Sequence, residues 1–480
     1  MTLYITIAAL IVAAFFVWFF SHQKGRPTIE SFLVSDRMIP LKWGIATVLA
    51  NWVQAPSLLL SGVFAYQGEW HFLVFLMPNV LALILMGILA PRMQKTLPTG
   101  YTMPQCMGSV YGGSVRTLSF FLALASLIFA IGYTLTGLRQ WFSAQLGISP
   151  MEMTFVLGTY AILCVMPKGL PGAVIGDAVK MGIVVSLMLG VVCLHVFYGG
   201  MERLETVSET LPATGLSPGM IFWTLGIPLA ISLLGGPICN PDLAERSYAL
   251  KREVVRTAYF WAAGVFGFVV LVFGSLGLLA KTLGLKVVSP SIPAFQVLQG
   301  ELPLEVTIVV SIALMVILGA ALASFLASTG DLIVIEVYRR LIKPTASDRE
   351  TIWFGRAFMG IPVLIGTYIA SIPNVDMSII VQSMSVIRGE AIFPFVAAVF
   401  LGRRVSGRSV FAGMLIGAIG GILLTFGASL SENFLGVKIP FLAVNGKSLG
   451  ALFAVLAPVV SISLSLVFLK FGKGRSVQPA

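Results

Sequence analysis

The chain has 480 residues, of which 57% are apolar and only 11% charged, and its mean hydropathy is +0.95. Apolar runs of about 20 residues recur along it, and each is long enough to cross a hydrocarbon core of roughly 30 Å. This composition excludes a soluble globular protein and predicts an all-α, polytopic membrane protein. The net charge of +11 does not indicate a nucleic-acid partner, because most of the lysines and arginines fall in the loops between the apolar runs.

Thirteen transmembrane helices are predicted, in chain order near residues 3–20, 43–66, 71–91, 117–144, 150–167, 172–198, 218–238, 254–280, 304–336, 353–371, 377–401, 409–429 and 448–469. The first has no basic n-region and no small-residue cleavage pattern before Lys24, so a retained helix is expected rather than a signal peptide. The loops are too short for a second folded unit. Residues 1–480 are therefore expected to form a single transmembrane domain.

The basic residues are divided unequally between the two sides of this predicted bundle. If the N-terminus is outside, one side collects most of the lysines and arginines of the loops. The other side then holds only Arg139, Arg203, Lys281, Lys286, Lys438 and Lys447. By the positive-inside rule the richer side is cytoplasmic. We therefore expect a plasma (inner) membrane protein with its N-terminus outside and its C-terminus in the cytoplasm.

Ten of the predicted spans divide into two sets of five. One set occupies residues 43–217 and the other residues 218–402, with an extra N-terminal helix and loop at 1–42 and two C-terminal helices at 403–480. Because each set has an odd number of spans, the second set enters the membrane from the opposite side. The pattern is therefore that of an inverted five-helix repeat.

The first helix of each set carries a proline near its middle. A proline donates no backbone N–H, so Pro56 is expected to leave the carbonyl of Trp52 unpaired, and Pro228 that of Thr224. In lipid such a carbonyl needs a partner, and inverted-repeat transporters place solute and ion sites at broken helices of this kind. Two ordinary proline kinks are the alternative. The residues that these breaks make candidates for solute contact are Asn51, Trp52, Gln54, Trp223 and Thr224.

Ionisable side chains inside the predicted spans are further candidates. Arg388 and Glu390 lie in the middle of the span 377–401, where each charge costs about 2.5 to 3.5 kcal/mol, so each should face the bundle or a wet cavity. Being two residues apart, they do not face one another. Arg388 could hold a substrate carboxylate by a two-pronged hydrogen bond. The alternative is a structural pair between Arg388 or Glu390 and one of two other buried charges, Asp177 and Lys180.

Asp177 and Lys180 lie on one face of the span 172–198, at positions i and i+3. They are candidates for ion coupling, because ionisable residues this deep in a span are functional by default. The alternative is a lysine that pairs with Asp177 for structure or extends toward the interface.

Several motifs, by their order and spacing, resemble the sodium/solute symporter family over nearly the whole chain. AlaAsnTrp with SerGlyValPheAlaTyrGlnGly, within residues 50–68, is similar to the first core helix of that family and most like its urea-transporter branch. The other similar segments are LeuProThrGlyTyrThrMetProGln at 97–105, LysGlyLeuProGlyAlaValIleGlyAsp at 168–177, AsnProAspLeuAlaGluArg at 240–246 and GluValTyrArgArg at 336–340.

The resemblance implies a core of the leucine-transporter type, with solute between helices one and six and sodium between helices one and eight. The family's two sodium-binding carbonyls map to Leu49 and Trp52, and its two hydroxyls to Ala320 and Ala321. Alanine cannot ligate a cation, and sodium needs several oxygen ligands to replace its hydration. Because Lys180 could supply a tethered charge instead, transport is expected not to depend on sodium.

Two forms of coupling remain open in this prediction, proton coupling through Lys180 and uncoupled transport. A conventional sodium-coupled symporter is the alternative if the alignment slips. The hydroxyls that could then serve as ligands are those of Ser324, Ser328 and Thr329.

The sequence thus predicts a secondary-active transporter of a small polar organic solute, working by alternating access. The expected partners are the solute and the lipid bilayer, and the oligomeric state is left open. No enzyme and no cofactor are expected, since the sequence has no nucleophile-and-base pattern and its cysteines and histidines are scattered. A transport-fold membrane sensor is the alternative function, while a channel would need a continuous polar path.

Overall fold

The computed structural model describes residues 28–138, 150–165, 169–197, 217–282, 304–372, 377–435 and 437–471, which are helical almost throughout. Within these residues, ten helices are long and apolar enough to cross a membrane, and a bent pair brings the number to eleven if it is one span. The prediction of an all-α polytopic protein is confirmed. The predicted span 3–20 lies outside the described residues, and each of the other twelve coincides with a helix or an interrupted helix.

Two short helical segments precede the bundle, α2 (Ile29–Val34) and η1 (Ser35–Arg37). The helices of the first predicted repeat are α3 (Leu41–Trp52), α4 (Ala55–Gln67), α5 (Glu69–Thr96), α6 (Met103–Tyr111), α7 (Gly113–Leu138), α9 (Pro150–Val165) and α10 (Leu170–Phe197). Those of the second are α12 (Pro218–Ile221), η3 (Phe222–Gly226), α13 (Ile227–Cys239), α14 (Pro241–Ala249), α15 (Val255–Thr282), α17 (Leu304–Ile333), η4 (Val334–Ile342), α18 (Asp348–Phe358), α19 (Ile361–Ser371), α20 (Met377–Leu401) and η5 (Gly402–Arg404).

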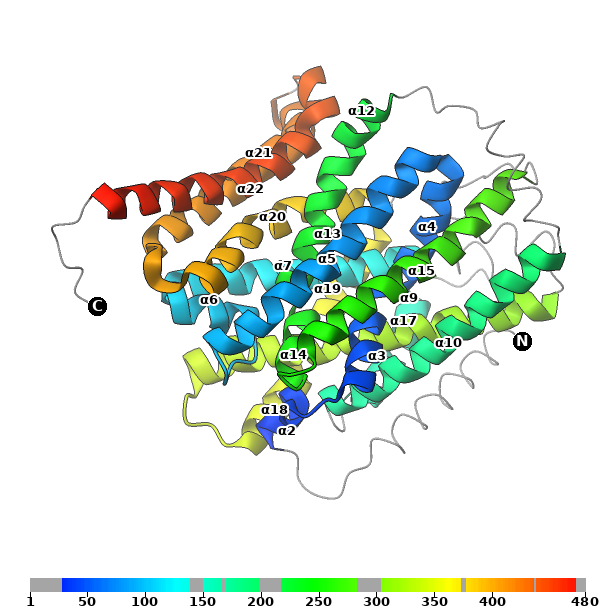
Figure 1. Cartoon of the computed structure of the whole chain (residues 1–480), viewed down its shortest axis with the longest axis horizontal. Coiled ribbons are helices and arrows are strands. Elements are labelled where there is room, and N and C mark those ends of the chain that lie inside the picture. The colour runs from blue at the N-terminus through cyan, green and yellow to red at the C-terminus, as the bar shows by residue number, and fades with distance from the viewer. Residues whose placement is uncertain are drawn as a thin grey trace.

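The last two helices, α21 (Gly407–Leu435) and α22 (Pro440–Phe471), pack against each other and against α20 at one edge of the bundle (Figure 1). At the centre stands α17, whose apolar window is 89% buried, whereas the corresponding window of α10 is only 22% buried. The outward face of α10 carries exposed apolar side chains such as Val185, Leu189 and Val196. Such a face suits contact with lipid, and a central helix that is apolar on every side suits the core.

One pair of glycines sets the closest helix crossing, between α4 and α15. A Cβ added at Gly277 would overlap the backbone of Gly62, so the two helices approach backbone to backbone. Small residues at a crossing of this kind allow van der Waals packing, which drives helix association in a membrane.

A buried carboxylate joins the loop before α6 to the end of the central helix. The side chain of Glu336, in η4, accepts hydrogen bonds from Thr102 Oγ1 and Arg116 Nε, each at 2.7 Å. Thr102 also caps the N-terminus of α6 together with Gln105. One charge thereby connects the start of α6, the start of α7 and the end of the α17–η4 helix.

The first predicted helix break is present. The axes of α3 and α4 differ by 58°, and residues 53 and 54 between them are not helical. The prediction from Pro56 that the carbonyl of Trp52 is unpaired is wrong. This carbonyl accepts a hydrogen bond from the backbone N–H of Gln54 at 3.1 Å.

The second predicted break is wrong in its position. The helix runs on past Pro228 through a π-helical turn, in which the N–H of Ile227 donates to the carbonyl of Phe222. A turn of this kind lets a helix pass a proline without losing its backbone pairing. The interruption comes instead at Asn240, an extended residue between α13 and α14 that is followed by Pro241.

Candidate functional site

A cavity of about 50 Å³ lies where the two helix breaks meet α20. Its lining comes from both repeats and consists of Trp52, Gln54, Ser57, Phe75, Asn79, Ala130, Tyr133, Leu233, Asn240, Val381, Met384 and Arg388. One water-sized position takes roughly 10–15 Å³ of such volume. The cavity is therefore small, with room for a few water-sized groups.

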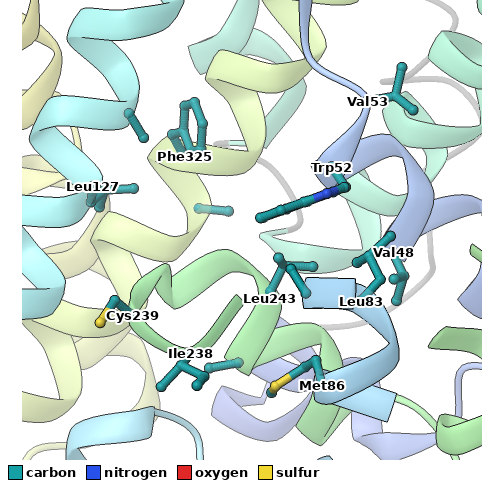
Figure 2. Close-up of a cluster of buried hydrophobic side chains, with 14 of the residues drawn as sticks. Val48, Trp52, Val53, Leu83, Met86, Leu127, Ile238, Cys239, Leu243 and Phe325 are labelled. Atoms are coloured by element: carbon teal, nitrogen blue, oxygen red, sulfur yellow. The ribbon is translucent and has the colours of Figure 1, made fainter. Parts of the chain in front are cut away.

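The first break presents polar and aromatic groups to this cavity. Gln54 precedes α4, where its backbone N–H donates to Ser57 Oγ at 3.0 Å and its side-chain Nε2 donates to the carbonyl of Asn51 at 3.0 Å. The Trp52 ring lies in the apolar core together with Leu243 and Phe325 (Figure 2). Its indole N–H is buried and has no acceptor among the described residues.

The second break is held to α7 and α20 by Arg388. Its guanidinium donates to Ser126 Oγ, to the carbonyl of Ser232 and to Asn240 Oδ1, each at 3.0 Å. Asn240 Oδ1 also accepts from Ser126 Oγ at 2.7 Å. No carboxylate of the described residues forms an ion pair with Arg388. The alternative in which Arg388 pairs with Asp177 is therefore wrong.

Two adjacent glycines make room for this arrangement. A Cβ added at Gly235 would lie 2.8 Å from the backbone oxygen of Arg388, and one added at Gly236 would lie 2.7 Å from the ring of Trp52. The glycines therefore let α13 approach α20 and the tryptophan closely, and they bring Arg388 and Trp52 to the same cavity.

Four of the candidate residues for solute contact lie elsewhere. The indole N–H of Trp223 donates to Asn445 of α22 at 2.9 Å, and Thr224 Oγ1 donates to the carbonyl of Met220 at 2.8 Å. Neither lines the cavity, because the helix is not broken at Pro228. Asn51 and Glu390 do not line it either.

Asn51 belongs to a buried ionic network next to the cavity, centred on Asp177. The Asp177 carboxylate accepts from Thr47 Oγ1 at 2.5 Å, from Asn51 Nδ2 at 3.2 Å and from Ser324 Oγ at 3.2 Å. Its ion partner is Arg246 of α14, at 3.5 Å, whose side chain is fully buried. Arg246 belongs to the motif at 240–246, but the sequence did not predict it as a site residue.

The alternative in which Lys180 pairs with Asp177 for structure or extends toward the interface is wrong. Lys180 is fully buried, and its ammonium donates to the carbonyl of Ala50 at 2.6 Å, one turn before the break of α3. The Lys180 ammonium is thus bound to α3 in the region where the resemblance implies a sodium ion. It binds the carbonyl of Ala50, next to the mapped carbonyl of Leu49.

At the four positions mapped to the sodium site, both carbonyls already accept a backbone hydrogen bond and both side chains lack a ligating atom. The carbonyl of Leu49 accepts from the N–H of Val53 at 2.7 Å, and that of Trp52 from Gln54. Ala320 and Ala321 are buried in α17 and carry only methyl groups. The hydroxyls that face the ionic network from α17 are those of Ser324 and Ser328.

The fold places these groups in a known architecture. A Na⁺-coupled sialic acid symporter, solved in a substrate-bound outward-open state, superposes with a TM-score of 0.77 at 13% identity, over 97% of this chain and 98% of that one. A nucleobase-cation-symport-1 transporter with bromovinylhydantoin bound gives 0.59 at 11% identity, over 93% and 95%. The chain therefore shares the fold of these two proteins. The predicted core of the leucine-transporter type is confirmed.

Two sequence relatives carry transporter names. The chain is 23% identical over 481 residues to probable urea active transporter 3 of Schizosaccharomyces pombe, covering 90% of this chain and 71% of the relative. It is 22% identical over 420 residues to the urea active transporter of Saccharomyces cerevisiae, covering 78% of this chain and 56% of the relative. No protein-family model matches the chain.

Proposed function

We propose that this chain is a secondary-active transporter of the sodium/solute symporter family that carries a small neutral amide of the urea class. The observation that carries the proposal is the cavity of about 50 Å³ at the two helix breaks. A cavity this small suits a small solute, and urea is one of the smallest polar organic solutes. The names of the two relatives, both urea active transporters, point to the same class of solute.

The lining is suited to an amide. A urea-type solute has one carbonyl acceptor and N–H donors on two nitrogens. Arg388 has five N–H donors, more than its bonds to protein acceptors require, and can donate to the solute carbonyl. Asn79 and Gln54 use their amide nitrogens on backbone carbonyls, and this leaves each amide oxygen as an acceptor for solute N–H groups.

In this proposal the two repeats, residues 43–217 and 218–402, move against each other around the cavity. Solute binds between the breaks of α3–α4 and α13–α14, as in other transporters built from inverted repeats. The position of Arg388 and Asn240 at the second break couples solute contact to the arrangement of that repeat.

Uptake of labelled urea into proteoliposomes tests the proposal. Wild-type protein is expected to give saturable uptake that unlabelled urea and other small amides inhibit. Asn79→Leu removes a solute acceptor at similar volume, and loss of one hydrogen bond of about 1.4 kcal/mol raises KM about tenfold. Asn433→Leu makes the same change on an exposed position of α21 and should leave KM unchanged. Flux that does not saturate, or an unchanged KM in Asn79→Leu, would contradict this assignment.

We further propose that Lys180 takes the place of a coupling sodium ion, since its ammonium donates to the Ala50 carbonyl inside the bundle. Urea uptake is then expected to be equal in sodium and choline buffers. Lys180→Ala frees the Ala50 carbonyl next to Asp177 and Thr47, and sodium should stabilise this variant but not the wild type. At ten times its Kd, sodium would add about 1.4 kcal/mol of stability, measured as a shift in thermal unfolding.

The opposite result has a specific form. Wild-type uptake that rises saturably with sodium, and that is lost in Ser324→Ala or Ser328→Ala, would establish a conventional sodium-coupled symporter. The two hydroxyls of α17 would then be the ligands, and Lys180 would have a structural role.

A further inference from the structure

Two carboxyl groups contact each other in the core, beside the ionic network. The Asp331 carboxyl of α17 lies beside the Glu245 carboxyl of α14, whose Oε2 accepts a hydrogen bond from Ser328 of α17, three residues before Asp331. These residues are only 3% and 2% exposed. Glu245 Oε1 and Asp331 Oδ2 are buried and receive no hydrogen bond from any N–H or O–H of the described residues. Two carboxyl groups in contact cannot both be ionised, and a proton between them satisfies both oxygens.

The charges around the pair also require a proton. Four buried carboxyl groups, those of Asp177, Asp242, Glu245 and Asp331, share three buried cations, Lys180, Arg246 and Arg388. Full ionisation would therefore leave one negative charge uncompensated in the core, which is costly in a medium that solvates ions poorly.

The other groups facing the pair do not remove this excess. Arg246 is the cation nearest to it, with Nη1 at 3.4 Å from Glu245 Oε2, but it also pairs with Asp177. Lys180 donates to a carbonyl of α3. Other titratable groups on the elements packed around this region include Asp242 and Tyr248 of α14, Tyr259 of α15, Arg388 of α20, Tyr160 and Cys164 of α9, and Cys106 of α6.

Ser328 equips the pair to gain and lose a proton. Its hydroxyl has one hydrogen and two oxygens within reach, Glu245 Oε2 at 2.6 Å and the carbonyl of Ser324 at 3.0 Å. It can donate to an ionised Glu245, or turn to Ser324 and accept from a protonated Glu245. The site therefore keeps its hydrogen bond in either state.

We propose that the Glu245–Asp331 pair, with Ser328, binds the proton that drives transport, an inference that rests on the transport function proposed above. The pair joins the central helix α17 to α14, and α14 begins directly after Asn240, which lines the solute cavity and accepts from Arg388. One nine-residue helix thus has the solute cavity at its start and Glu245 in its middle. Movement of α14 relative to α17 separates the two carboxyl groups, both ionise, and the proton leaves.

The test uses purified full-length protein in sodium-free proteoliposomes, with labelled urea as the probe. Counterflow at equal pH needs only alternating access. Accumulation under an inward gradient of about two pH units needs proton coupling, and one proton per solute supports up to about 100-fold accumulation. Wild-type protein should show both activities, and a protonophore should abolish the accumulation.

Asp331→Asn and Glu245→Gln keep the shape of each side chain and remove its proton exchange. Each is expected to retain counterflow and to lose accumulation. Asp36→Asn makes the same change on an exposed carboxylate before the bundle and should keep both activities. Size-exclusion profiles select variants that fold, and two positions are available if one does not.

Three results would overturn the assignment. Accumulation that persists in both variants would remove the pair from coupling. Loss of counterflow together with accumulation in both folded variants would give the pair a structural role. In a parallel assay with a sodium gradient in place of the pH gradient, accumulation that is lost in both variants would make it a sodium site. Absence of counterflow in the wild type would instead refute the proposed transport itself.

Discussion

Arg388→Lys is expected to destabilise the fold around the cavity and to weaken solute binding. The guanidinium reaches acceptors on α7, on α13 and at the second break, each at 3.0 Å. An ammonium carries all its N–H groups on one atom and cannot reach three separated acceptors. If two bonds of about 1.5–3 kcal/mol each are lost, the gross cost is about 3–6 kcal/mol. Water that enters the cavity recovers part of this, so a net loss of about 3 kcal/mol is expected.

The effect on solute has a separate origin. In the proposed complex one further N–H of Arg388 donates to the solute carbonyl, and losing a bond of about 1.4 kcal/mol raises KM about tenfold. Thermal unfolding in detergent and the concentration dependence of urea uptake measure the two effects. Arg404→Lys, at an exposed position of η5, is the matched control and should change neither.

The outcome separates the two roles of Arg388. An unchanged unfolding temperature would refute the argument from hydrogen bonds. Lowered stability with an unchanged KM would keep the structural role and refute the contact with solute.

Two further substitutions test how the helices are joined. Glu336→Gln keeps the shape of a side chain that has no exposed surface but removes its charge. The free energy of unfolding, measured by thermal unfolding, is expected to fall by about 2 kcal/mol. An unchanged stability would contradict the connection of α6, α7 and α17. Gly277→Ala places a methyl group against the backbone of Gly62 and is expected to cost about 1–3 kcal/mol. Gly264→Ala on the same helix meets nothing within 4 Å, so equal unfolding temperatures for the two alanine variants would refute the close crossing.

The helical architecture follows from the sequence because lipid leaves a spanning segment few choices. Backbone groups in hydrocarbon must pair within the segment, so an apolar run of sufficient length becomes a helix whatever its neighbours do. Composition and hydropathy therefore predicted the spans within the described residues, and the odd number of helices per set predicted an inverted repeat.

The helix breaks show where local pattern stops being sufficient. Pro56 and Pro228 have similar surroundings in the sequence, but a π-helical turn absorbs the second, because a helix can shift its pairing by one residue at small cost. The sequence did carry a signal for the true break, since a residue before proline disfavours the helical region and Asn240 precedes Pro241. The predicted break was nevertheless at Pro228, twelve residues before the motif at 240–246 that contains this signal.

Glu245 and Arg246 lie in a predicted loop, and only the structure shows that they are buried. The sequence by itself determined that Asp177, Lys180 and Arg388 are buried, since all three lie inside apolar runs. Only the tertiary structure decided their partners. Asp177 pairs with Arg246, 69 positions away along the chain, and Lys180 binds a carbonyl on another helix. For an ionisable residue inside an apolar run, burial follows from the local composition. Its partner depends on how the helices rotate and cross, and the packing of many side chains across the whole bundle sets those angles.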